Sequence, residues 1–100
     1  MYIATFFSYY GAMLFKRYGD NAGWQPKLMA VPRQLSSSCG TCVAFNTVKV
    51  DVTTWMDENL ELKEELAAVY KVEYKDIAEG EPFDDVDAPN YVLVYSCDHQ

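Results

Sequence analysis

Two cysteines separated by a glycine and a threonine form the stretch of this 100-residue sequence that best suggests covalent chemistry. Cys39-Gly40-Thr41-Cys42 follows three consecutive serines, and Arg33 stands a few residues before them. A cysteine reacts as its thiolate, which nearby cations and free backbone N–H groups stabilise. Arg33 supplies a cation, the serine loop offers backbone that can wrap an anion, and Gly40 leaves room for another molecule. The stretch therefore predicts a nucleophilic thiol at Cys39.

The role of Cys42 depends on the backbone at Gly40. The residues after Cys42 (Val-Ala-Phe-Asn-Thr-Val) are β-rich, which places Cys42 on a strand. Three residues of extended chain separate two Cα atoms by roughly 10 Å, whereas a disulfide tolerates at most about 7 Å. Extended geometry makes Cys42 a buried core thiol. A turn at Gly40 would instead make it a resolving thiol and the pair a dithiol redox site.

Cys97 and His99 offer a third interpretation. Together with Cys39 and Cys42 they make three sulfurs and one imidazole, which is a ligand set for structural zinc. The spacing of Cys-Asp-His is atypical for such a site, and the chain has a single C-x-x-C. We therefore expect neither a metal nor another cofactor. The odd number of cysteines also disfavours a secreted disulfide framework and favours a reducing cytoplasm.

The rest of the chain offers little support for catalysis. The acidic run over residues 79–87 lacks the pairing in an apolar pocket that general acid/base work needs. His99 alone supports no catalytic triad, and no glycine-rich phosphate loop is present. The sequence therefore favours a carrier or accessory protein over a stand-alone enzyme.

Charge and hydropathy disfavour two classes of partner. The net charge is −7, and the scattered basic residues make no phosphate-binding stripe, so we expect no nucleic-acid binding. No apolar run approaches the ~18 residues that span a bilayer, so we expect no membrane insertion. The apolar segment Tyr2–Ser8 has no preceding basic residues and no cleavage site, so it does not read as a signal peptide.

The hydrophobic pattern predicts strand, helix, strand, strand, helix, strand. The expected ranges are Tyr2–Phe7, Tyr9–Tyr18, Lys27–Val31, Thr41–Val50, a helix capped at Asp51, Thr53 or Thr54 and reaching about Ala67, and Tyr70–Lys75. This order is that of the ferredoxin-like βαββαβ sandwich, an α+β fold with four antiparallel strands and two helices on one face.

A C-terminal extension follows this domain. Residues 1–76 form the ferredoxin-like domain, and residues 77–100 form an acidic linker and a C-terminal strand. Gly80, Pro82 and Pro89 mark the linker. Tyr91–Tyr95 is apolar throughout and must be covered. It is expected either to add a fifth strand at the sheet edge or to pair with a second subunit in a homodimer.

The chain also resembles a known family at the cysteine stretch. Residues 1 to about 75 are similar to the putative selenium/sulfur carrier protein-like family of small bacterial domains. The matching features are Tyr2-Ile-Ala-Thr-Phe, Val31-Pro32-Arg33 and Ser36-Ser37-Ser38-Cys39-Gly40. Ala30 stands where many members have a proline, the tail after Lys75 extends past the shared region, and Cys42 belongs to only part of the family.

The resemblance implies a ferredoxin-like fold and a sulfur or selenium carrier role, with Cys39 as the carrier thiol. Cys39 would attack a persulfide or selenium donor and pass the atom on, so donor and acceptor proteins are the implied partners. Arg33 and Gly40 would shape its surroundings. The competing hypothesis is a non-catalytic interaction module, with Tyr91–Tyr95 as the interface and Cys39 incidental.

Overall fold

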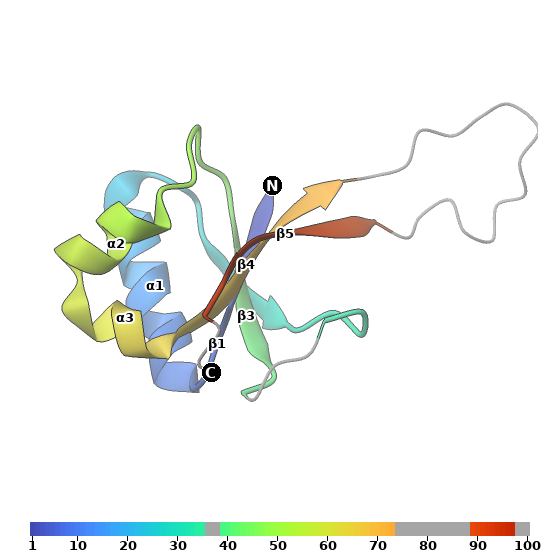
Figure 1. The fold of residues 1–100 in the computed structure, drawn as a ribbon, viewed down its shortest axis with the longest axis horizontal. Helices are drawn as coiled ribbons and strands as arrows, with labels where there is room; N and C mark the ends of the chain where they lie inside the picture. The colour runs from blue at the N-terminus through green and yellow to red at the C-terminus, as the bar shows by residue number, and fades with distance from the viewer. Residues whose placement is uncertain (36–38, 74–88, 98–100) are drawn as a thin grey trace, which may run out of the picture.

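One antiparallel sheet organises the chain, and helices cover one of its faces. The computed structural model describes residues 1–35, 39–73 and 89–97. The elements are β1 (Tyr2–Phe6), α1 (Tyr9–Ala22), β2 (Lys27–Ala30), β3 (Thr41–Phe45), α2 (Val52–Glu58), α3 (Leu60–Glu65), β4 (Leu66–Glu73) and β5 (Asn90–Ser96). The strands lie in the order β2-β3-β1-β4-β5, and every neighbouring pair is antiparallel (Figure 1). The α+β class is confirmed.

β1 lies at the centre of the sheet, between β3 and β4. Its residues Ile3–Phe6 are all buried, because the strand has a packed layer on each face. Continuous apolar sequence is typical of such a strand. The central position that the sequence predicted for this segment is confirmed.

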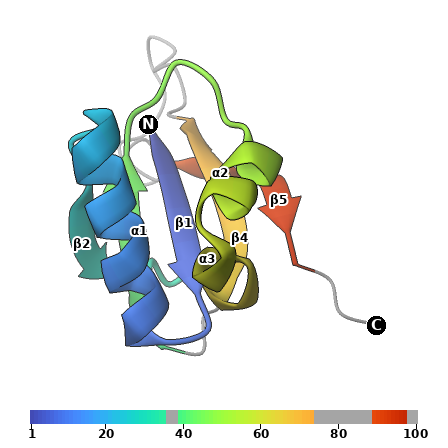
Figure 2. The ribbon, with the colours of Figure 1, turned by 90° about the vertical axis from the view of Figure 1, so that its left-hand side faces the viewer.

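The main core lies between the sheet and the helical layer of α1, α2 and α3 (Figure 2). Aromatic rings from both layers meet there. The ring centroid of Phe15 on α1 lies 5.0 Å from that of Phe45 and 5.6 Å from that of Trp55, in edge-to-face geometry. Trp24 closes the group, 4.8 Å from Trp55. Such ring pairs add to the stability that burial of their area provides.

A second, smaller cluster lies on the sheet face without helices. It consists of Ile3, Cys42, Ala44 and Val72, and Val31, Leu35 and Tyr91 pack against it. The two clusters use alternate residues of the same strands, because successive side chains of a strand point to opposite faces. This alternation places Cys42 in the second cluster.

The helical layer is also joined by hydroxyl–carboxylate hydrogen bonds. Hydroxyl groups of α1 and its N-cap residue donate to glutamates of α2 and α3: Ser8 to Glu65, Tyr10 to Glu61, and Tyr18 to Glu58 at 2.7 Å. Burial and the Glu58 carboxylate raise the pKa of Tyr18 to about 12. The Glu61 carboxylate likewise raises the pKa of Tyr10.

The predicted single helix to Ala67 is wrong, because the chain breaks at Asn59 and changes to a strand at Leu66. Asn59 has extended backbone angles, φ −138° and ψ 94°, and separates α2 from α3. Asp51 is the N-cap and accepts from the Thr54 N–H. β4 then starts at Leu66, whose partner on β1 is Phe6, rather than at Tyr70 as predicted. Backbone pairing with β1 therefore overrides the helical spacing of Leu62 and Leu66.

Two further boundaries differ from the prediction. β3 ends at Phe45 rather than Val50, since the Asn46 N–H donates to the Trp24 carbonyl instead of continuing the ladder. α1 continues past Tyr18 to Ala22 and ends at Gly23, which has φ +78°. That left-handed conformation ends many helices at a glycine. Lys27–Val31 was predicted one residue too long.

The predicted fifth strand is present at the sheet edge. β5 pairs with β4 over Ala68–Glu73, with a bulge between Val69 and Tyr70. The predicted acidic linker lies outside the described residues up to position 88. No helix in the described ranges is long and apolar enough to cross a bilayer.

Gly11 provides a test of the contact between α1 and α3. A Cβ at this buried glycine would lie 2.5 Å from the Cβ of Glu65, which is not the flexible end of that side chain. Gly11→Ala gains up to ~1 kcal/mol of helix propensity, but overpacking costs ~1–3 kcal/mol. We expect a lower urea midpoint for Gly11→Ala, and no loss for Asn21→Ala at an exposed position of α1. A higher midpoint for Gly11→Ala would contradict the close contact.

Candidate functional site

Cys39 lies in the connection between β2 and β3, at the sheet edge where β2 ends. Beyond the Ala30–Thr41 pair, the Val31 N–H donates to the Gly40 carbonyl at 3.1 Å and extends the pairing by one bond. Gly40 has φ +73°, a left-handed conformation that favours glycine. A Cβ at Gly40 would have no atom of a described residue within 4 Å. The backbone therefore turns immediately after Cys39, and no described residue fills the space beside the turn.

The Cys39 sulfur contacts both backbone groups of Thr41. Its S–H donates to the Thr41 carbonyl at 3.0 Å, and the Thr41 N–H donates to the sulfur at 3.4 Å. Deprotonation would remove the first contact and strengthen the second, because an N–H bond to a charged acceptor is stronger. The side chain is half-buried and packs against the main core. An amide donor thus faces a sulfur that is reachable from solvent.

Cys42 has different surroundings, although it is only three residues away. Its side chain is fully buried in the second cluster, and its S–H points to the Ala30 carbonyl at 3.7 Å. Burial raises the pKa of Cys42 to about 11, and the neighbouring Cys39 adds to the increase. Cys42 is therefore a neutral thiol at physiological pH.

The two sulfurs leave the chain toward opposite faces of the sheet. Cys39 packs against the main core and Cys42 lies in the second cluster. Both cysteines are present as thiols. The turn at Gly40, which the sequence alone left open, is thus present. It does not gather the sulfurs on one face, and this favours the core-thiol interpretation of Cys42.

Arg33 is exposed in the turn that follows β2. The Leu35 N–H donates to the Pro32 carbonyl at 3.0 Å and holds this turn. No ion pair joins Arg33 to another described residue. Ser36, Ser37 and Ser38 lie outside the described residues. The structure thus places Arg33 on the exposed turn before the serines, and its predicted effect on Cys39 stays a prediction.

Cys97 lies just after β5, where its N–H donates to the Ala67 carbonyl at 2.8 Å. His99 lies outside the described part of the chain. Within the described ranges, no three His, Cys, Asp or Glu side chains gather as a metal site would require. The zinc interpretation gains no support from these residues.

The N-terminus of α1 lies at the same end of the sheet as the cysteine turn. Thr5, at the end of β1, pairs with Cys42, and Ser8 then caps α1 by accepting from the Gly11 N–H. A helix N-terminus carries partial positive charge. Neither the N-terminus of α1 nor the Thr41 N–H was predicted to lie near the cysteine turn. Ser8, a typical N-cap residue, was a visible signal for the helix N-terminus. The short spacing from Gly40 to Cys42, with Thr41 alone between them, was only a weak signal for the Thr41 N–H.

A family model described as putative Se/S carrier protein-like matches residues 1–79. The chain belongs to this family. The match includes β1 to β4 and the whole cysteine turn, while β5 lies beyond it. The resemblance seen in the sequence is thereby confirmed. Searches of curated proteins and of solved structures gave no match.

The burial of Cys42 predicts a specific loss of stability at alkaline pH. Its pKa is about 11 in the folded chain against an ordinary value of 9.0, so the unfolded chain loses this proton first. The resulting stability is complete below pH 9 and is lost as pH rises toward 11, by about 1–3 kcal/mol. Urea unfolding of wild type and Cys42→Ala across this range should show a steeper decline for wild type. Equal declines of the unfolding free energy with pH in the two proteins would contradict a raised pKa at Cys42.

Proposed function

We propose that the protein is a sulfur or selenium carrier in which Cys39 holds the transferred atom. The family description supports the carrier role. The choice of Cys39 as the carrier thiol rests on the contrast between the two thiols. Cys39 is half-buried beside an open glycine turn and faces the Thr41 N–H, whereas Cys42 is fully buried with a raised pKa.

The transfer needs no external oxidant. The Cys39 thiolate attacks the terminal sulfur of a donor persulfide, R–S–SH. The new S–S bond forms from the Cys39 electron pair, and the donor S–S bond breaks with its pair leaving on the donor thiolate. An acceptor nucleophile then attacks the terminal sulfur and Cys39 leaves as thiolate. With an R–S–SeH donor the same two steps carry selenium.

The remaining residues have supporting roles in this proposal. Gly40 allows the turn and keeps the approach to the sulfur clear, and Arg33 adds positive charge to the connection. Cys42 stays in the core rather than resolving a disulfide. Donor and acceptor proteins are the partners, and a cytoplasmic setting keeps the thiols reduced. The protein acts as a carrier rather than as an independent enzyme.

We also propose that the fold is a ferredoxin-like sandwich over residues 1–76, with residues 77–100 as its extension. The order β2-β3-β1-β4 and the placement of α1 between β1 and β2 support this assignment. The split of the second helix into α2 and α3, and the addition of β5, are departures from the simplest form.

Mass spectrometry after loading tests the carrier role. Reduced protein is incubated with a cysteine desulfurase and cysteine, and the modified peptide is then mapped. We expect wild type and Cys42→Ala to gain the mass of one sulfur on Cys39, since loading needs the accessible thiolate. Cys39→Ser should gain none.

Cys97→Ser is the matched control, because it removes the other half-buried thiol of the described chain. It should load as wild type does. Loading of Cys39→Ser to the wild-type level, or no loading of wild type at all, would contradict the proposal.

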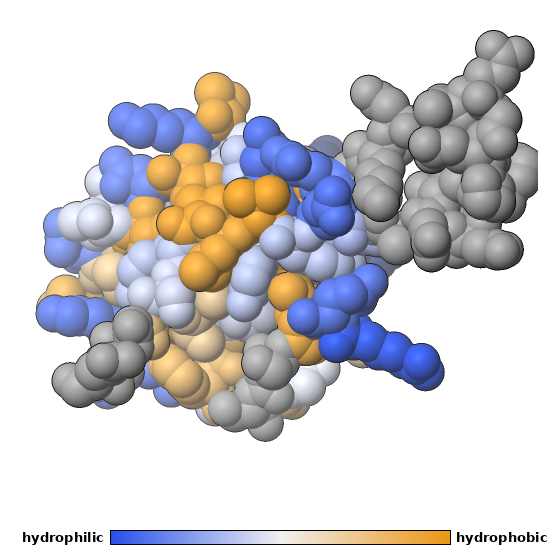
Figure 3. All heavy atoms as spheres, turned by 45° about the vertical axis from the view of Figure 1, so that its right-hand side comes forward, coloured by the Kyte–Doolittle hydropathy of each residue, from blue (hydrophilic) through white to orange (hydrophobic). Residues whose placement is uncertain are grey.

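The second candidate, an interaction module that dimerises through Tyr91–Tyr95, is favoured by one observation. Val92, Leu93 and Val94 are consecutive on the edge strand β5 and are 44%, 55% and 45% exposed. Figure 3 shows apolar side chains gathered over this part of the surface. Among the described strands, β5 pairs with β4 alone. An uncharged apolar edge is a template for pairing with another strand.

Sedimentation of the purified chain tests this candidate. If β5 pairs with its copy, wild type sediments as a dimer, and Val94→Lys shifts it to the monomer because the charge cannot be buried at the interface. Val48→Lys, at a fully exposed loop position, should leave the dimer intact. A wild-type chain that stays monomeric at all concentrations would exclude the candidate, with no bearing on loading of Cys39.

A further inference from the structure

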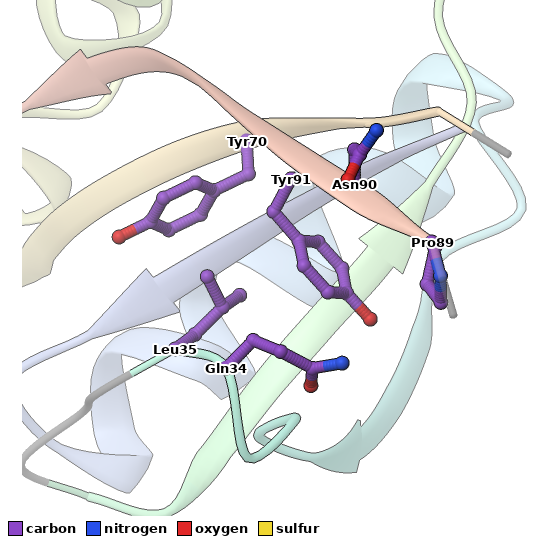
Figure 4. Close-up of a pocket in the computed structure, with 6 residues that line it drawn as sticks. All are labelled: Gln34, Leu35, Tyr70, Pro89, Asn90 and Tyr91. Carbon is purple, nitrogen blue, oxygen red and sulfur yellow. The ribbon is translucent and has the colours of Figure 1, made fainter. Parts of the chain in front are cut away.

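A hollow on the helix-free face of the sheet is lined by segments that are far apart in the sequence. Its volume is about 380 Å³, within the range of ~300–1,000 Å³ for small-molecule pockets. It is lined by residues of the turn after β2, of β4 and of the start of β5: Gln34, Leu35, Tyr70, Pro89, Asn90 and Tyr91 (Figure 4). The part from β5 lies beyond the family match.

Two tyrosine rings form one side of the hollow. Tyr91 pairs with Val72, and Tyr70 is two residues before Val72 on β4, so the tyrosines are diagonal neighbours on one face. The volume of the hollow leaves room for one planar ring against a tyrosine face. Figure 4 shows both rings on the side of the sheet where Leu35 lies.

The carboxamide of Gln34 provides polar groups at the rim. It offers an N–H₂ donor and a carbonyl acceptor, and Figure 4 shows it beside the Tyr91 hydroxyl, whereas the Asn90 side chain points away from Gln34. None of the described lining residues is charged. An anionic ligand would therefore find no counter-charge among the lining residues, in a chain whose net charge is already −7. A purely apolar ring could make no hydrogen bond with the Gln34 carboxamide.

The walls are held in place without a ligand. The Leu35 N–H donates to the Pro32 carbonyl, and both Leu35 and Tyr91 pack against the second cluster. Tyr91 is also fixed by the pairing of β5 with β4. A preformed site binds with less loss of side-chain freedom.

We propose that this hollow binds a planar, uncharged heterocycle with donors and acceptors on its edge, of the nucleobase type. The ring stacks on Tyr91 beside Tyr70, and its edge meets the carboxamide of Gln34. Aromatic faces for stacking and amides for the edge are the groups by which proteins hold an unpaired base. The site does not use Cys39, so it stands independently of the carrier role.

Two-dimensional NMR with free nucleosides tests the proposal, using full-length Cys39→Ser so that thiol chemistry plays no part. Adenosine and uridine should cause saturable shifts in the side-chain amide of Gln34 and in the backbone near Tyr91. Adenosine monophosphate should bind no more tightly than adenosine. Tyr91→Leu should weaken binding about tenfold or more, the loss expected for one stacking ring.

Tyr9→Leu is the matched control, because Tyr9 is an exposed tyrosine of α1 outside the hollow. It should bind as the parent does. Tyr91→Phe keeps the ring and its packing, so it should retain most of the binding even if Tyr91→Leu is poorly folded, and Gln34→Leu should weaken binding with the fold intact. Absence of saturable shifts with both nucleosides would overturn the proposal, as would equal binding by parent, Tyr91→Leu and Gln34→Leu.

Discussion

Burial of β1 on both faces is the constraint on which the rest of the molecule depends. With Ile3 on one face and Ala4 and Phe6 on the other, the strand needs two packed layers. The aromatic core beneath the helices provides one, and the smaller cluster provides the second. The antiparallel neighbours β3 and β4 continue the same alternation. A residue's place in this alternation therefore fixes which layer it joins.

The different surroundings of the two cysteines are related to that constraint. Cys42 is in register with Thr5 on β1 and enters the smaller cluster, while Cys39 precedes the strand and is released from the register by the turn at Gly40. Their difference in burial therefore comes from the strand register at Cys42 together with the turn at Gly40. Cys39-x-x-Cys42 resembles a dithiol pair in sequence, but strand geometry separates the sulfurs, unlike a pair on the first turn of a helix.

Much of the architecture could be predicted from the residues, and the failures share one cause. β1, the start of α1 and the edge strand β5 have local signals that agree with their tertiary roles: two-sided apolar sequence, the Ser8 cap and an uncharged apolar run. Leu62, Leu66 and Val69 all reach one core, but through a helix and a strand rather than through a single helix. Pairing of Leu66 with Phe6 across more than fifty residues cannot be seen in a local pattern. The hollow beside Tyr91 was missed for the same reason, since its sides meet only when β5 joins β4.

The hydroxyl–carboxylate bonds of the helical layer have a consequence for a chain so poor in basic residues. The last fifty residues carry fourteen carboxylates and three lysines, and the first fifty provide few cations to offset them. Tyr10 and Tyr18 instead present neutral phenols to Glu61 and Glu58, and their raised pKa values keep them protonated well into alkaline conditions. Screening by dissolved ions weakens contacts between opposite charges far more than it weakens such neutral donors. These contacts between α1 and the acidic helices α2 and α3 thus tolerate wide changes in ionic strength.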